Sequence, residues 1–157
     1  HRRQSRAFGG RGERPAARVH AVDVGHGQLH ARLQNDPRVV SREGTDARHL
    51  TAADFPDGAP ELIVSDVSFI SLSLVLPPVL ALAAPRAQLA ALVKPQFEAG
   101  PAKVNKGVVR DPQVHEAVCA KIRALVEELG WHCLGLVPSP IEGGDGNREF
   151  LIGAARG

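Results

Sequence analysis

Short apolar runs alternate along this chain with segments whose apolar residues recur at helical spacing. Runs of roughly four to eight apolar residues bounded by glycine, proline or charge are typical of strands. They predict strands at residues 19–24, 38–41, 61–66, 87–95, 131–140 and 148–155. Helical spacing predicts helices at residues 28–34, at 68–84 with an interruption near Pro77, and at 112–129.

The last of these helices carries clear signals at both ends. Asp111 is a good N-cap, Pro112 suits a first helical turn, and Gly130 is placed to end the helix. Its apolar face comprises Val114, Val118, Ile122, Leu125, Val126 and Leu129. A helix with one apolar face is expected to cover a sheet.

The order of the predicted elements indicates the class of fold. Strands that alternate with helices are typical of a parallel α/β sheet. The last two strands are joined by a loop alone, so a helical crossover is impossible and they should pair antiparallel. The run at 87–95 is almost continuously apolar, as in strands buried on both faces. We therefore predict an α/β fold with a mostly parallel sheet and an antiparallel last strand.

Composition narrows the class of protein. The chain has 157 residues, 43% of them hydrophobic and 23% charged, with a net charge of +2, which fits one soluble domain. Six of the fifteen arginines fall in residues 1–18, which show no apolar periodicity and are predicted to be a disordered basic leader before a domain at 19–157. No apolar run has the length of a membrane span, and the histidines and two cysteines have no metal-ligand spacing. We expect a cytoplasmic protein without a metal or a membrane partner.

Three charged residues stand at the ends of predicted strands. In an open parallel sheet, ligands bind beyond the carboxyl ends of the strands. Asp66 and Lys94 end two strands, and Glu149 begins the last strand, whose antiparallel direction puts it at the same edge. Any one of these charges could simply mark where a strand meets water. Together they predict a lysine flanked by two carboxylates, which could orient a hydroxyl group or accept its proton.

Four segments carry a resemblance to a known family. They are DVSFISL (66–72), VKPQFEAG (93–100), KGVVRDPQVHE (106–116) and PSPIEGGDGNREFL (138–151). Together they resemble the TlyA-type ribosomal RNA 2′-O-methyltransferases of the FtsJ-like class, a family that also includes proteins labelled haemolysins. The resemblance covers roughly residues 19–155.

This resemblance implies a Rossmann-like sheet that uses S-adenosylmethionine, with ribosomal RNA or a ribosomal subunit as the partner. It implies that Asp66, Lys94 and Glu149 belong to a catalytic Lys-Asp-Lys-Glu set, in which Lys94 deprotonates or steers a ribose 2′-hydroxyl. Asp66 would also lie against the cofactor. The first lysine of the set, the first strand with its main cofactor loop, and the family's N-terminal S4-like domain have no counterpart here, so we expect an N-terminally truncated fold with impaired cofactor binding.

The stretch VDVGHGQLH (22–30) looks like a cofactor loop because a strand leads into Gly-x-Gly. By the resemblance it matches the family's second strand instead, which implies that Asp23 binds the cofactor ribose. A direct role as the main loop stays open. The resemblance also places Asp46 near the adenine, with an ordinary turn aspartate as the alternative.

Basic residues near the predicted edge are candidates for RNA contact. They are Lys103, Lys106, Arg110 and Arg148, and a solvated basic surface is the alternative reading. With one tryptophan and five phenylalanines, we do not expect an aromatic platform for bases. Two other functions compete with methyl transfer, namely a non-catalytic RNA-binding remnant and membrane lysis. The absence of an apolar span or a cationic amphipathic helix speaks against membrane lysis.

Overall fold

The structure, a computed structural model, describes residues 18–25 and 31–157. The chain divides into two compact units, residues 1–49 and 50–157. The predicted leader lies outside the described residues except for Arg18, and so does Gly27 of the VDVGHGQLH stretch. Each unit is described by itself below.

The first unit contains a small parallel sheet. Its elements are β1 (Val19–Val22), α1 (Ala31–Gln34), β2 (Val39–Arg42) and the 3₁₀ helix η1 (Ala47–His49). Strands β1 and β2 pair in parallel, with Val19 opposite Val39 and Val22 opposite Arg42. Both strands were predicted from the apolar pattern, and the structure confirms them.

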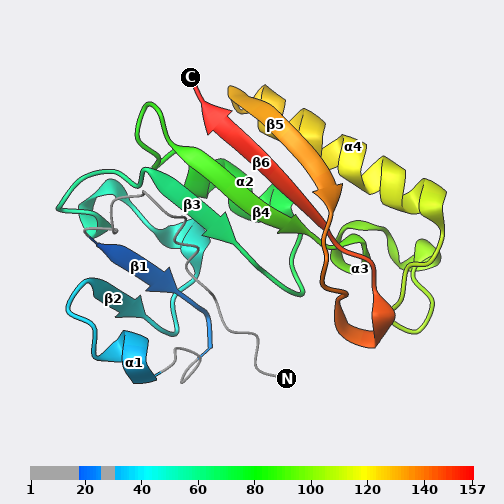
Figure 1. Ribbon diagram of the computed structural model, residues 1–157, viewed down its shortest axis with the longest axis horizontal. Helices are drawn as coiled ribbons and strands as arrows, with labels where there is room; N and C mark the ends of the chain where they lie inside the picture. Colours follow the sequence, from blue (N-terminus) through cyan, green and yellow to red (C-terminus); the bar gives the residue numbers. More distant parts are fainter. Residues whose placement is uncertain (1–17, 26–30) are drawn as a thin grey trace. The chain divides into compact units, whose positions relative to one another are not determined.

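The second unit is built on a four-stranded sheet in the order β3-β4-β6-β5. Its strands are β3 (Leu62–Ser65), β4 (Gln88–Val93), β5 (Trp131–Pro138) and β6 (Phe150–Arg156). Its helices are η2 (Ala52–Asp54), α2 (Leu72–Leu80), α3 (Pro95–Glu98), η3 (Pro101–Lys103), α4 (Pro112–Glu128) and η4 (Gly144–Gly146). β3 and β4 are parallel, and β6 runs antiparallel to both of its neighbours (Figure 1). The antiparallel last strand is confirmed.

One hydrophobic core joins the four-stranded sheet to helices α2 and α4, and α4 runs alongside β5 (Figure 1). Its buried side chains include Leu72, Leu76 and Leu80 of α2, Val118, Ile122 and Val126 of α4, and Leu89, Val93, Trp131 and Ile152 of the strands. On β4 every second residue is buried, whereas Ala90 and Leu92 between them are only half-buried. The expectation that this strand is buried on both faces is therefore wrong.

Helix α2 corrects the prediction of an interrupted helix. It runs through Pro77 and Pro78 without a break. A proline in a helix interior removes a backbone donor and costs about 3 kcal/mol, which is why the sequence suggested an interruption. Burial of one face of the helix opposes that cost, because each buried large aliphatic side chain contributes about 1.5–3 kcal/mol. The buried residues are Leu72, Val75, Leu76 and Leu80.

The start of α2 also lies later than predicted. Ser71 is its N-cap and accepts a hydrogen bond from the backbone N–H of Ser73 at 3.1 Å. Two residues earlier, Phe69 has a φ of 64°, a left-handed conformation that interrupts a right-handed helix. Residues 66–71 therefore form a loop between β3 and α2, whereas the helical spacing had suggested a start at Ser68.

Strand β3 is an edge strand with exposed apolar side chains. In the part of the chain that the structure describes, β1 pairs only with β2 and β3 pairs only with β4. The side chains of Leu62 and Val64 are 61% and 70% exposed.

The predicted boundaries of α4 are confirmed. The Asp111 carboxylate accepts a hydrogen bond from the N–H of Gln113 at 2.9 Å, and Gly130 has a φ of 86° just past the helix.

We expect Asp111→Ala to lower the free energy of unfolding by about 1 kcal/mol, because one N-terminal donor loses its acceptor. Urea unfolding followed by circular dichroism measures this change. Asp111→Ser keeps a capping oxygen and should stay close to the parent; equal loss in both variants would contradict the capping role.

Candidate active site

Lys94 is a buried lysine at the carboxyl end of β4. It is 5% exposed, and its backbone forms the N-cap of α3, whose first residue is Pro95. Its Nζ lies 2.5 Å from Oδ1 of Asp66 and donates a hydrogen bond to the Ser68 hydroxyl at 3.0 Å. A buried ammonium needs such partners, because removing one member of a buried ion pair costs about 3–5 kcal/mol. The parallel pairing of β3 with β4 brings Asp66 and Lys94 to the same edge of the sheet.

Glu149 lies at the same edge of the sheet because β6 runs antiparallel to β4. The ladder between β4 and β6 ends with Val93 opposite Phe150, so Lys94 and Glu149 are the next residues of the two strands. Glu149 is 2% exposed, and its Oε2 accepts a hydrogen bond from the amide of Gln96 at 2.9 Å. The three charges predicted at one edge are thus placed there, and their catalytic role stays a prediction.

The turn before Glu149 leaves little room around its carboxylate. A Cβ added to Gly143 would overlap Oε2 of Glu149, so any larger residue here would force the Glu149 carboxylate to shift. Asn147 fixes the same turn from inside. It is buried, accepts a hydrogen bond from the N–H of Val109 at 3.0 Å, and donates to the carbonyl of Gly107 at 2.8 Å. Asn147 therefore links the turn before Glu149 to the segment at residues 107–109.

Two aromatic rings lie in the segments that carry Lys94, Asp66 and Ser68, here called the Lys94 cluster, although the composition predicted no aromatic platform. Phe69 is 90% exposed, in the loop that carries Asp66 and Ser68. Its ring centroid is 4.8 Å from that of Phe97, three residues after Lys94. A left-handed backbone at a residue other than glycine costs about 1–3 kcal/mol. Such strain occurs most often at functional sites. The positive φ could not be read from the sequence.

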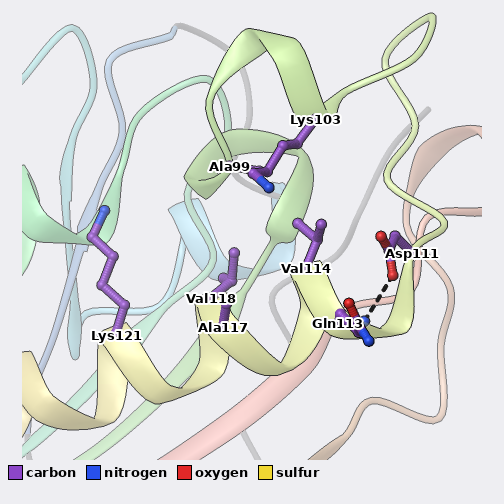
Figure 2. Close-up of a pocket in the computed structure, with 8 residues that line it drawn as sticks. All are labelled: Ala99, Lys103, Asp111, Gln113, Val114, Ala117, Val118 and Lys121. Atoms are coloured by element: carbon purple, nitrogen blue, oxygen red, sulfur yellow. Dashed lines mark hydrogen bonds between the residues drawn. The ribbon is translucent and has the colours of Figure 1, made fainter.

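The four candidate RNA contacts are all exposed side chains of the second unit. They are Lys103, Lys106, Arg110 and Arg148. Lys103 also borders a cavity of about 400 Å³ between η3 and α4, with Lys121 on the helix side (Figure 2). In Figure 2, Val114, Ala117 and Val118 project from α4 toward the segment that carries Ala99 and Lys103. None of the residues that line this cavity belongs to the Lys94 cluster.

The two candidate cofactor residues Asp23 and Asp46 lie in the first unit. Asp23 follows β1 and is exposed, and its Oδ1 accepts a hydrogen bond from the N–H of Gly25 at 2.7 Å. The Asp46 carboxylate is bound by the Arg48 guanidinium at 2.6 Å and accepts the backbone N–H of Arg48 at the start of η1. Hydrogen bonds from Arg48 lower the pKa of Asp46 to about 2. The observed contacts of Asp46 are those of the turn aspartate, the alternative left open by the sequence.

Residues 18–25 and 31–157 contain no group of three or more His, Cys, Asp or Glu side chains that could hold a metal ion. Over the same ranges, no helix combines the length and the apolar character that crossing a membrane requires.

The model of one known protein family matches almost the whole chain. The profile described as "FtsJ-like methyltransferase" matches residues 9–156. The chain belongs to the FtsJ-like methyltransferase family. Methyltransferases of this family use S-adenosylmethionine, and the fold of the chain agrees with that class.

Several relatives of this FtsJ-like chain carry the names of rRNA methyltransferases. TlyA of Mycobacterium tuberculosis, a "16S/23S rRNA (cytidine-2'-O)-methyltransferase", is 46% identical over 141 residues, which are 89% of this chain and 52% of that protein. YqxC of Bacillus subtilis, also named for rRNA methyltransferase activity, is 51% identical over 138 residues, 87% of this chain and 49% of its own length. The chain therefore spans about half the length of the curated relatives it matches.

Solved structures agree with the family assignment. A Lactococcus lactis protein described as a hemolysin has a TM-score of 0.86 and 43% sequence identity, covering 90% of this chain and 68% of that one. A Listeria monocytogenes protein described as an S-adenosylmethionine-dependent methyltransferase has a TM-score of 0.62 at 14% identity, covering 90% and 81%. The second likeness shows the methyltransferase fold alone.

The contact between Gly143 and Glu149 gives a test of the site in this FtsJ-like chain. We expect Gly143→Ala to displace the Glu149 carboxylate and to lower methyl transfer about 10²-fold, because small displacements of a catalytic group have effects of that size. Gly144→Ala is the matched control, since a Cβ there meets nothing within 4 Å. Methyl incorporation is measured for both variants. Equal rates for the two would show that the position of Glu149 does not matter.

The Asp46–Arg48 contact predicts a pH effect. In Arg48→Ala, the pKa of Asp46 should rise from about 2 toward its ordinary 3.8, because the guanidinium hydrogen bonds are lost and only the backbone N–H of residue 48 still donates to the carboxylate. A lowered pKa means that the contact stabilises the fold above pH 3.8 and loses this effect as the pH falls through about 2. Carboxyl NMR titration measures the shift. Asp36, held at about 2 by Arg38, is the internal reference and should not change.

Proposed function

We propose that this chain transfers a methyl group from S-adenosylmethionine to a ribose 2′-hydroxyl of ribosomal RNA. The observation that carries the proposal is the buried amine of Lys94, held by Asp66 and Ser68 at the edge that Glu149 also reaches. Membership of the FtsJ-like family supports the methyl transfer. The names of the rRNA methyltransferase relatives support ribosomal RNA as the substrate.

Lys94 is the residue that would act on the hydroxyl group. An ammonium carries three N–H groups. Two described contacts use Nζ, one with Asp66 and one with Ser68, so one N–H remains for a ligand oxygen. Held in this way, Nζ would align the 2′-oxygen for attack and stabilise the negative charge that develops on it, or take its proton when the amine is neutral.

The carboxylates around Lys94 set where its amine points. Asp66 contacts Nζ directly, whereas Glu149 is buried beside the end of β4 and is held by Gln96. Two carboxylates at one edge favour a cation between them, which keeps the lysine in place while the substrate changes. The low exposure of Lys94 and Glu149 also strengthens every electrostatic interaction in the site, because little water screens it.

Asp23 is a described residue that could contact a bound S-adenosylmethionine. The cofactor supplies a methyl group on a positively charged sulfur. Asp23, an exposed carboxylate directly after a parallel strand, has the chemistry and position to accept hydrogen bonds from ribose hydroxyls. Asp46 fits the cofactor less well, because its carboxylate is already engaged by Arg48.

Phe69 and Phe97 suit the nucleobase that is attached to the reacting ribose. RNA-modifying proteins commonly hold unstacked bases against aromatic rings, and stacking contributes about 1–3 kcal/mol per base. The exposed ring of Phe69 lies in the same loop as Asp66, so a base on this ring would sit beside the ribose at Lys94. The exposed cations Lys103, Lys106, Arg110 and Arg148 would contact RNA phosphates.

The test is the transfer of labelled methyl from S-adenosylmethionine to ribosomal RNA. We expect Lys94→Ala to reduce incorporation by about 10²–10⁴-fold, the usual contribution of a group that moves or directs a proton. Lys121→Ala is the matched control, because it removes an exposed lysine of the same unit that lies outside the Lys94 cluster.

The outcomes separate the competing functions. Equal incorporation by the parent and by Lys94→Ala would remove Lys94 from the reaction. A folded parent that binds ribosomal RNA in a salt-dependent manner but transfers no methyl group would favour the RNA-binding remnant. Circular dichroism of each variant shows whether a lost activity is a lost fold.

A further inference from the structure

The short helix α3 contacts both flanks of the Lys94 cluster. It is one helical turn, Pro95–Glu98, and it begins directly after Lys94. Gln96 donates to Oε2 of Glu149 at 2.9 Å, a contact across 53 residues of sequence. Glu98 accepts hydrogen bonds from the Ser71 hydroxyl at 2.6 Å and from the backbone N–H of Leu72 at 2.7 Å. Through these side-chain contacts, α3 links Glu149, just before β6, to the start of α2.

The contact of Glu98 fixes one end of the loop that carries Asp66. Residues 66–71 leave β3 at one end and enter α2 at the other. Leu72 is the first residue of α2, so its N–H has no partner inside the helix and depends on Glu98. The negative charge of Glu98 also suits the positive end of the helix. With both ends held, the loop keeps Asp66 and Ser68 within reach of Lys94.

The contact of Gln96 fixes the other carboxylate. Oε2 of Glu149 has the Gln96 amide on one side, and a Cβ at Gly143 would overlap the same oxygen. The other end of the Gln96 side chain, Oε1, is buried without a hydrogen-bond partner. A buried unpaired acceptor lowers stability, so the Gln96 amide is present here at a cost to the fold. Such a cost is expected where a residue serves a site.

We propose that α3 is a positioning element for methyl transfer, in which Gln96 orients Glu149 and Glu98 holds the loop of Asp66 and Ser68 against Lys94. This inference rests on the proposed function. No positioning role for either residue follows from the sequence, because both act through contacts with residues far away along the chain. Their effect is on the geometry of the reacting groups, so they should influence kcat more than KM.

The test for Glu98 uses the full chain and three variants. Glu98→Ala should lower kcat about 10²-fold and leave KM for RNA within about threefold, because the loop and not the RNA surface is disturbed. Glu98→Gln keeps an acceptor for Leu72 and a partner for Ser71, so it should restore kcat to near the parent value. Glu127→Ala is the control, since Glu127 is an exposed carboxylate of α4 paired with Arg123.

Amide exchange gives a readout that needs no activity. The Leu72 amide should exchange faster in Glu98→Ala than in the parent and in Glu127→Ala. Unchanged exchange, or an unchanged kcat with faster exchange, would overturn the role of Glu98. A Glu98→Gln variant as slow as Glu98→Ala would also overturn it, because the hydrogen bonds would then not be what matters.

A double-mutant cycle tests Gln96. If Gln96 acts only through Glu149, then Gln96→Ala combined with Glu149→Ala should lower kcat no further than Glu149→Ala alone. Multiplicative losses would contradict the assigned role of Gln96. A parent chain that transfers no methyl group refutes the proposed function itself, whereas an active parent with active Gln96 and Glu98 variants refutes only the positioning role of α3.

Discussion

The arrangement of the site depends on one constraint, the need to hold a cationic lysine where almost no water reaches it. An ammonium at the end of a buried strand is tolerated only with close anionic or polar partners. Asp66 and Ser68 supply them from the neighbouring parallel strand and its following loop. Glu98 of α3 binds the start of α2, at the end of the loop that carries these two partners.

The reversed direction of β6 brings a second carboxylate, that of Glu149, to the same edge of the sheet. If β6 ran parallel to β4, its first residues would lie at the opposite edge of the sheet, far from Lys94. Because β6 is antiparallel and lies between β4 and β5, the residue just before it reaches the edge that holds the ends of β3 and β4. Segments from three distant parts of the sequence therefore reach one edge of the sheet, without any of them being close along the chain.

Strand positions and directions could be predicted from the sequence, because apolar runs, turn residues and the length of a connection determine them locally. That reasoning placed Asp66, Lys94 and Glu149 at one edge. It failed for α2, where burial of a leucine face outweighs the two prolines. It also could not find the left-handed backbone of Phe69 or the contacts of Gln96 and Glu98, since such a backbone and contacts over 26 to 53 residues arise only in the folded chain.

The uncovered side of β3 has a consequence for how this polypeptide behaves in concentrated solution. Along that side the backbone donors and acceptors have no neighbouring strand in the described part of the chain, and Leu62 and Val64 stand out from the sheet beside them. An unpaired edge strand with exposed apolar side chains is a template for cross-molecular β-pairing. Oligomers or precipitates that form through Leu62–Ser65 are therefore the expected fate of preparations in which nothing else shields this strand.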